Sequence, residues 1–164
     1  MENNVDNPGQ SNIKLEFADI DVSLVLIGLL VKMNIRNLNI SKIKKYIYDC
    51  KKSGQYERIL SCFEIDEDLN SMQLKECYSF LKLCRVLAKN GDTLYINDNN
   101  FDYDSIFVEY HGILFECEQM LTDFFKKNPE EFSPMRFFDY YIFEDYFKQN
   151  DLLNSKKKKR QEKL

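Results

Sequence analysis

Residues 22–31 read Val22-Ser23-Leu24-Val25-Leu26-Ile27-Gly28-Leu29-Leu30-Val31, and this stretch decides how the rest of the chain must be arranged. A surface helix needs only one apolar stripe, whereas a helix here would be apolar on nearly every side. We therefore expect a helix at the centre of the fold, capped by Asp19 or Asp21. The run is about half of the roughly 20 residues that a membrane-spanning helix needs, so no membrane segment is expected.

More helices are predicted downstream, where apolar residues recur at spacings of three and four. The second helix begins at Asn39 or Ser41 and ends at Gly54. A later helix begins at Ser71 as its N-cap and stops at Asn90-Gly91. The remaining expected helices span about 55–63 and 111–127.

The hydrophobic period changes from helical to alternating after the Asn90-Gly91 stop. Residues 93–97 and 105–110 are typical of β-strands and flank a turn rich in Asn and Asp, which predicts a hairpin with a long tip. A run of helices followed by one hairpin is the pattern of a winged-helix domain. We therefore predict a mainly α, winged-helix-like fold in which the helix 71–90 takes the recognition position.

The composition fits one domain. The chain has 164 residues, is 44% hydrophobic and 14% aromatic, and has only five Gly and three Pro, too few for a sandwich of many short strands. We expect a disordered leader at 1–14, a single domain at 15–150 and a flexible basic tail at 151–164. The polar N-terminus resembles no secretory signal, so a cytoplasmic protein with reduced thiols is expected.

Charge is unevenly distributed along the chain. Residues 98–151 carry 4 basic and 13 acidic side chains, a net charge of −9, and residues 152–164 carry a net charge of +5. Basic residues also cluster between Lys32 and Arg58. The Lys32–Arg58 cluster is either a solvated helix face or a phosphate-tracking surface, and the basic tail either keeps the chain in solution, contacts DNA without sequence preference or binds an acidic partner. The candidate nucleic-acid contacts are Lys44, Lys45, Lys51, Lys52, Lys156, Lys157, Lys158, Lys159 and Arg160.

The predicted recognition helix is poorly suited to reading DNA bases. Its basic residues are Lys75, Lys82, Arg85 and Lys89, with Glu76 among them. It lacks the dense edge of Arg, Asn and Gln that base readout needs. The helix therefore offers few of the side chains that sequence-specific DNA binding uses.

A second unusual helix is predicted near the end of the chain, with Ser133 as N-cap and Pro134 in its first turn. Its aromatic residues cover more than one side, so part of its burial is expected to come from another chain. The predicted partner-binding residues are Phe137, Phe138, Tyr140, Tyr141, Phe143, Tyr146 and Phe147.

No catalytic, cofactor or metal site is predicted. His111 is the one histidine and has no triad or zinc partner at a recognisable spacing. The acidic loop around Asp98, Asp102 and Asp104 lacks the EF-hand spacing, and no phosphate-binding glycine motif occurs. The five cysteines lie on apolar stripes, where a free thiol packs as a small hydrophobe: Cys50, Cys62, Cys77, Cys84 and Cys117.

A family resemblance is carried by two stretches of sequence and by the predicted hairpin and helix pair that follow them. The stretches read Ala18-Asp19-Ile20-Asp21-Val22-Ser23-Leu24-Val25-Leu26 and Leu38-Asn39-Ile40-Ser41-Lys42-Ile43-Lys44-Lys45-Tyr46-Ile47-Tyr48. The chain resembles the small middle components of bacterial ABC-type three-component defence systems, the group of the Lamassu C subunit, over roughly residues 15–127. The resemblance implies a winged-helix-like subunit that joins an SMC-like ATPase to an effector, often a nuclease. It supplies no catalytic residue, and the aromatic helix and lysine tail lie outside it.

Three hypotheses follow. The first is a non-catalytic assembly subunit of an anti-phage defence complex. The second is a winged-helix DNA-binding regulator, although the acidic second half of the chain repels phosphate. The third is a small enzyme or a toxin–antitoxin member, for which an antitoxin-type inhibitor would bind a single partner.

Overall fold

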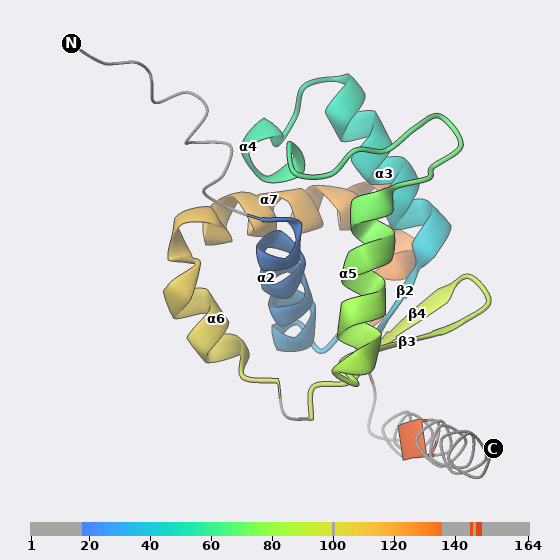
Figure 1. Cartoon of the computed structure of the whole chain (residues 1–164), viewed down its shortest axis with the longest axis vertical. Coiled ribbons are helices and arrows are strands. Elements are labelled where there is room, and N and C mark those ends of the chain that lie inside the picture. The colour runs from blue at the N-terminus through green and yellow to red at the C-terminus, as the bar shows by residue number, and fades with distance from the viewer. Residues whose placement is uncertain (1–17, 100, 136–144, 146, 149–164) are drawn as a thin grey trace, which may run out of the picture.

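The computed structural model describes residues 18–99, 101–135, 145, 147 and 148 of the chain. The elements shown in Figure 1 follow one another as α2 (Asp19–Lys32), β2 (Asn37–Asn39), α3 (Ile40–Lys52), α4 (Glu57–Leu60), α5 (Met72–Leu83), β3 (Leu87–Asn90), β4 (Thr93–Ile96), α6 (Tyr103–Glu109), α7 (His111–Lys127) and the 3₁₀ helix η1 (Pro129–Glu131).

A small antiparallel sheet accompanies the helices. Its strand order is β2-β4-β3, with Leu38 opposite Leu94 and Leu87 opposite Ile96. Strand β2 comes between α2 and α3, and the β3–β4 hairpin follows α5, as in a winged-helix domain. The predicted mainly α fold with one β-hairpin is therefore confirmed.

The predicted helix over 71–90 is too long, and the hairpin is displaced as a result. Helix α5 ends at Leu83, and Arg85 then adopts a positive φ of 63°, which turns the chain. Residues 87–90 form β3 and pair with β4. The Asn90-Gly91 pair, which we expected to stop a helix, instead leads from β3 into the hairpin turn: Asn90 is the last residue of β3, and Gly91 lies in the turn with a φ of 61°.

The strand predicted at 105–110 is wrong, because this segment is helix α6. The carboxylate of Asp102 accepts hydrogen bonds from the Ser105 backbone N–H at 3.2 Å and from its hydroxyl at 2.7 Å, which caps the helix. Partly buried Ile106 and Phe107 then pack against the core. The cap and this packing override the β-type composition of the segment.

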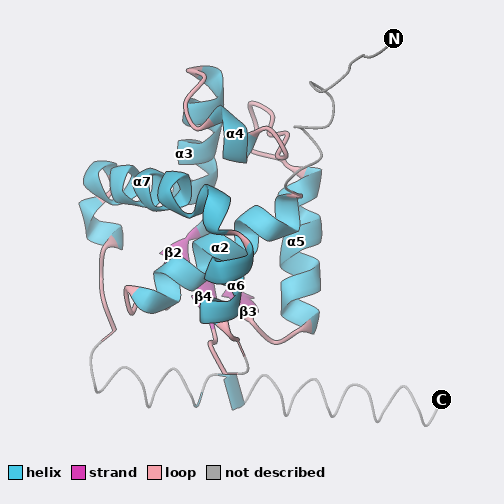
Figure 2. Cartoon of the chain, turned by 90° about the vertical axis from the view of Figure 1, so that its left-hand side faces the viewer, coloured by secondary structure: helices cyan, strands magenta, loops and turns pink. Residues whose placement is uncertain are grey.

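Helix α2 is central, as its composition predicts. Figure 2 shows α2 between α5 and α7, and Figure 1 shows α6 on another side of it. Val22 and Val25 are fully buried. The Cβ of any side chain at Gly28 would lie 2.9 Å from Cε1 of Phe107, so this glycine lets α6 approach α2 closely.

The helix caps are partly as expected. Asn39 caps α3 by accepting from the Lys42 N–H, and Ser71 caps α5 by accepting from the Leu74 N–H. Neither Asp19 nor Asp21 is the N-cap of α2, which is Ala18. Asp21 instead accepts a hydrogen bond from the Ala18 N–H at 2.9 Å, as the third residue of a helix often does.

Residues 133–135 do not form the start of the predicted aromatic helix. Ser133 and Pro134 lie in no helix, so neither forms a helix N-terminus. Met135 is tied to the turn after α2: its N–H donates to the Asn34 carbonyl at 2.8 Å, and the Asn34 amide donates to its carbonyl at 2.9 Å. Helical residues follow at 145, 147 and 148.

Candidate interaction surfaces

The side of α5 that faces away from the core carries exposed apolar residues. Its inward stripe consists of Leu74, Cys77, Tyr78 and Leu81, spaced at three and four residues, and it packs on the core. The opposite side, which we call the α5 outer face, consists of Met72, Glu76, Ser79, Phe80 and Leu83.

The exposure of three of these residues is large. Met72 is 64% exposed, Phe80 is 54% exposed and Leu83 is 84% exposed. Single exposed apolar side chains are ordinary, but three on the same side of one helix give that side the apolar character found at protein interfaces. Met and Phe are also residue types that interfaces favour.

This face does not suit the reading of DNA. A recognition helix contacts base edges mainly through Arg, Lys, Asn and Gln. The α5 outer face has none of these residue types and includes the acidic Glu76. Lys75 and Lys82 lie on one flank of the helix instead of at its outermost point.

The four lysines of α3 that are predicted to contact nucleic acid differ in their partners and exposure. Lys51 Nζ donates to the Leu60 carbonyl at 2.9 Å, and Lys45 pairs with Asp49 at 3.0 Å. Lys44 is half-buried and Lys52 is exposed. The other predicted contacts, at residues 156–160, lie outside the described residues.

Two further cations of the Lys32–Arg58 cluster, Lys42 and Arg58, have acidic partners. Lys42 pairs with Glu130 at 2.8 Å and with Glu131 at 3.6 Å, and Arg58 pairs with Glu116. These pairs neutralise part of the cluster. The net charge counted along the sequence therefore overstates the positive surface that is available to phosphate.

Arg36 of the same cluster is structural. Only 4% of its side chain is exposed, and its guanidinium donates to the Val31 carbonyl at 3.0 Å and to Asp98 at 3.1 Å. A buried cation needs such partners to offset its lost hydration. The Arg36–Asp98 pair thus ties the residue before β2 to the loop between β4 and α6.

The thiols have the environment of core residues. Cys50, Cys77 and Cys117 are buried, and Cys62 is half-buried. Burial raises the pKa of Cys62 to about 12, that of Cys77 to about 11 and that of Cys117 to about 12. A nucleophilic thiol needs a lowered pKa, so these residues fill space.

The remaining candidates for chemistry lie apart. His111 is exposed, and its Nδ1 lies 3.1 Å from the Val108 carbonyl. Asp98 pairs with Arg36, and Asp102 caps α6. Within residues 18–99 and 101–135 and the three described residues beyond, no three His, Cys, Asp or Glu side chains are grouped so that they could hold a metal ion.

Of the aromatic residues that are predicted to bind a partner, the structure describes Phe147 alone. Phe147 is 9% exposed and makes a contact. Phe137, Phe138, Tyr140, Tyr141, Phe143 and Tyr146 lie outside the described residues.

The sequence-based prediction did not include the α5 outer face as an interaction surface. The signal is present, because Met72, Phe80 and Leu83 are apolar yet lie outside the stripe of Leu74 and Leu81.

In the part of the chain that the structure describes, no helix combines the length and apolar character needed to cross a membrane. No family model, curated protein or solved structure matches the chain.

Proposed function

We propose that this chain is a small non-catalytic subunit that holds partner proteins together through the α5 outer face. The observation that carries the proposal is the exposure of Met72, Phe80 and Leu83 on the helix that would otherwise read DNA. Burial of one such side chain stabilises a complex by roughly 1.5–3 kcal/mol, so a partner that covers all three gains a substantial contact.

The family resemblance supplies the identity of the partners in this proposal. They would be an SMC-like ATPase and a nuclease-type effector of a bacterial anti-phage defence complex in the cytoplasm. The aromatic segment 137–147 would be a second contact, because its Phe and Tyr side chains are of the types that anchor interfaces. An antitoxin-type inhibitor would use the same surfaces with a single partner.

The test is co-purification of the tagged chain with the products of its neighbouring genes. In the double variant Phe80→Glu/Leu83→Glu, we expect the yield of co-purified partner to fall by about tenfold or more, because two charges would be buried in an apolar contact. The control is Phe115→Glu, which changes an equally exposed apolar residue, 68% exposed, on α7.

Two results would overturn the proposal. One is full retention of every partner by the double variant. The other is duplex DNA binding by the chain alone that weakens steeply with salt and is lost in Lys44→Glu/Lys52→Glu, since that behaviour belongs to a DNA-binding regulator.

A further inference from the structure

A groove separate from the α5 outer face lies between α3 and α5 and has a volume of about 240 Å³. Its lining comes from α2, α3, α5, α7 and the sheet. The apolar side chains that line it and remain half-exposed are Leu26, Ile40, Ile43, Leu74, Tyr78 and Leu94. Met72, Phe80 and Leu83 do not line it.

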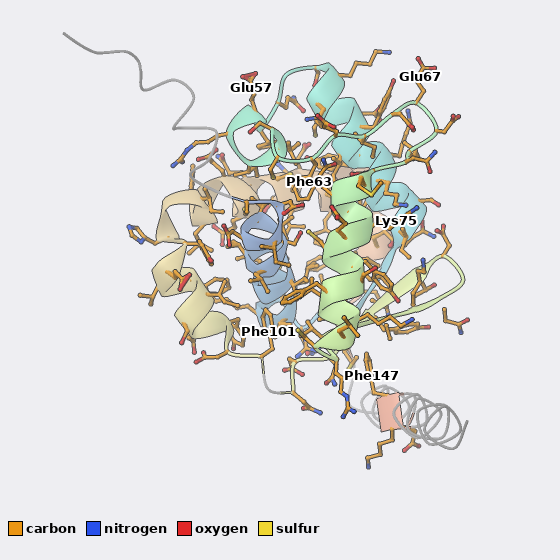
Figure 3. All side chains as sticks on the ribbon, in the orientation of Figure 1. Glu57, Phe63, Glu67, Lys75, Phe101 and Phe147 are labelled. Carbon is orange, nitrogen blue, oxygen red and sulfur yellow. The ribbon has the colours of Figure 1, made fainter. Side chains whose placement is uncertain are left out.

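Every charged side chain that lines this groove is a lysine. Lys44 belongs to α3, Lys75 to α5 and Lys89 to β3. Lys75 lies between α5 and α3 in the view of Figure 3. Lys89 Nζ lies 5.0 Å from the centroid of the Tyr78 ring. Lys44 and Lys75 have no acidic partner among residues 18–99 and 101–135.

An apolar trough whose charged lining residues are all lysines favours an occupant with apolar and acidic side chains. A cavity of about 150 Å³ takes one benzene ring, so a volume of about 240 Å³ accommodates one aromatic ring with room for a second, smaller apolar side chain. The lysines come from three elements that border the trough. A helix presents carboxylates along both flanks of its apolar stripe, so it can pair with lysines on more than one of these elements.

We propose that the α3–α5 groove binds an acidic amphipathic helix of a partner protein. Two apolar side chains, spaced three or four residues apart on that helix, enter the trough. Glu or Asp side chains beside them pair with Lys44, Lys75 and Lys89. The inference deepens the proposed function by naming the chemistry of a partner segment, and it rests on that function for the existence of a partner.

The experiment selects peptides on the full chain. The probe is a displayed library of helical peptides of about 16 residues, with apolar residues fixed at i, i+3, i+4 and i+7 and the other positions varied among Glu, Gln and Lys. We expect recovered peptides to be enriched in Glu over Lys. The Kd of one recovered peptide, measured by fluorescence anisotropy, should rise about tenfold or more in Lys44→Glu/Lys75→Glu.

Matched variants separate this site from the α5 outer face. Lys52→Glu/Lys126→Glu makes the same charge change at exposed positions away from the groove, and it should leave the Kd within about twofold of the original. Phe80→Glu/Leu83→Glu should also leave it unchanged, although it releases partners in the co-purification.

The inference is overturned if the selection recovers no peptide, if recovered peptides show no excess of Glu, or if the groove variant binds as tightly as the original chain. Loss of partners in Phe80→Glu/Leu83→Glu together with any of these results would overturn the groove alone and leave the proposed function standing.

Discussion

At the scale of single residues, the five cysteines differ in how far reagents can reach them. Cys84 follows the last residue of α5 and is exposed, whereas Cys62 is half-buried and Cys50, Cys77 and Cys117 are buried. Burial also raises the pKa of these four thiols, which lowers their thiolate fraction. Poor access and a small thiolate fraction therefore both slow the reaction of these four thiols.

We expect one thiol per folded chain to react rapidly with a disulfide reagent at neutral pH, and we expect it to be Cys84. The measurement is the amplitude of the fast phase, and Cys84→Ser should remove that phase while leaving the slow reaction of the others. Addition of denaturant should expose all five thiols. A fast phase that persists in Cys84→Ser would show that a core cysteine is accessible and contradict the assigned packing.

At the scale of elements, the contact between α2 and α6 depends on one glycine. A Cβ at Gly28 would lie 2.9 Å from Phe107 Cε1 and 3.1 Å from Tyr103 Cβ. Gly28→Leu should therefore lower the free energy of unfolding by about 2 kcal/mol, because the larger side chain forces α6 away from α2. Urea unfolding measures the loss, seen as a lower midpoint.

A double-mutant cycle tests the cause of that loss. In a Phe107→Leu background, where the ring is smaller, Gly28→Leu should cost less than it does in the original chain. An equal cost in both backgrounds would mean that the loss comes from somewhere other than the α2–α6 contact.

The same pair of helices shows why the element order could be predicted only in part. The run 22–31 predicts α2 because its composition alone demands burial. Residues 105–110 are locally typical of a strand, and their helical state depends on the Asp102 cap and on α2 as a packing partner. Similarly, Leu87 continues the helical spacing of α5, and only its pairing with Ile96 makes it a strand residue. Long-range pairing of this kind is not written in local periodicity.

At the scale of the whole molecule, the sequence overestimates the cationic surface and misses the groove. Lys42, Lys45 and Arg58 are paired with carboxylates, two of them with residues more than fifty positions away along the chain. The groove is equally non-local, because Lys44, Lys75 and Lys89 border one trough only after the fold has brought α3, α5 and β3 together. A count of charges along the chain cannot show either arrangement.

The buried thiols and tyrosines also give the whole molecule a pH dependence at alkaline pH. Tyr46 is buried and its hydroxyl donates to Asp123 at 2.7 Å, and burial together with this hydrogen bond raises its pKa. Burial raises the pKa of Cys62 and Cys117 to about 12 from an ordinary value of 9.0. A group with a raised folded-state pKa contributes stability that is complete below its unfolded pKa and is lost as the pH rises toward the folded value.

The free energy of unfolding should therefore be level near neutral pH and should fall once the pH exceeds about 9, where thiols ionise in the unfolded chain but not in the folded one. Urea midpoints taken between about pH 7 and pH 10.5, with a reductant present, measure this fall. Cys117→Ala should lower the midpoint at every pH through the cavity it leaves, yet make the alkaline fall shallower. Cys84→Ser serves as the control, because it removes an exposed thiol and leaves the buried thiols in place. A midpoint that stays constant up to pH 10.5 would contradict the burial of these thiols, because their ionisation would then be the same in both states.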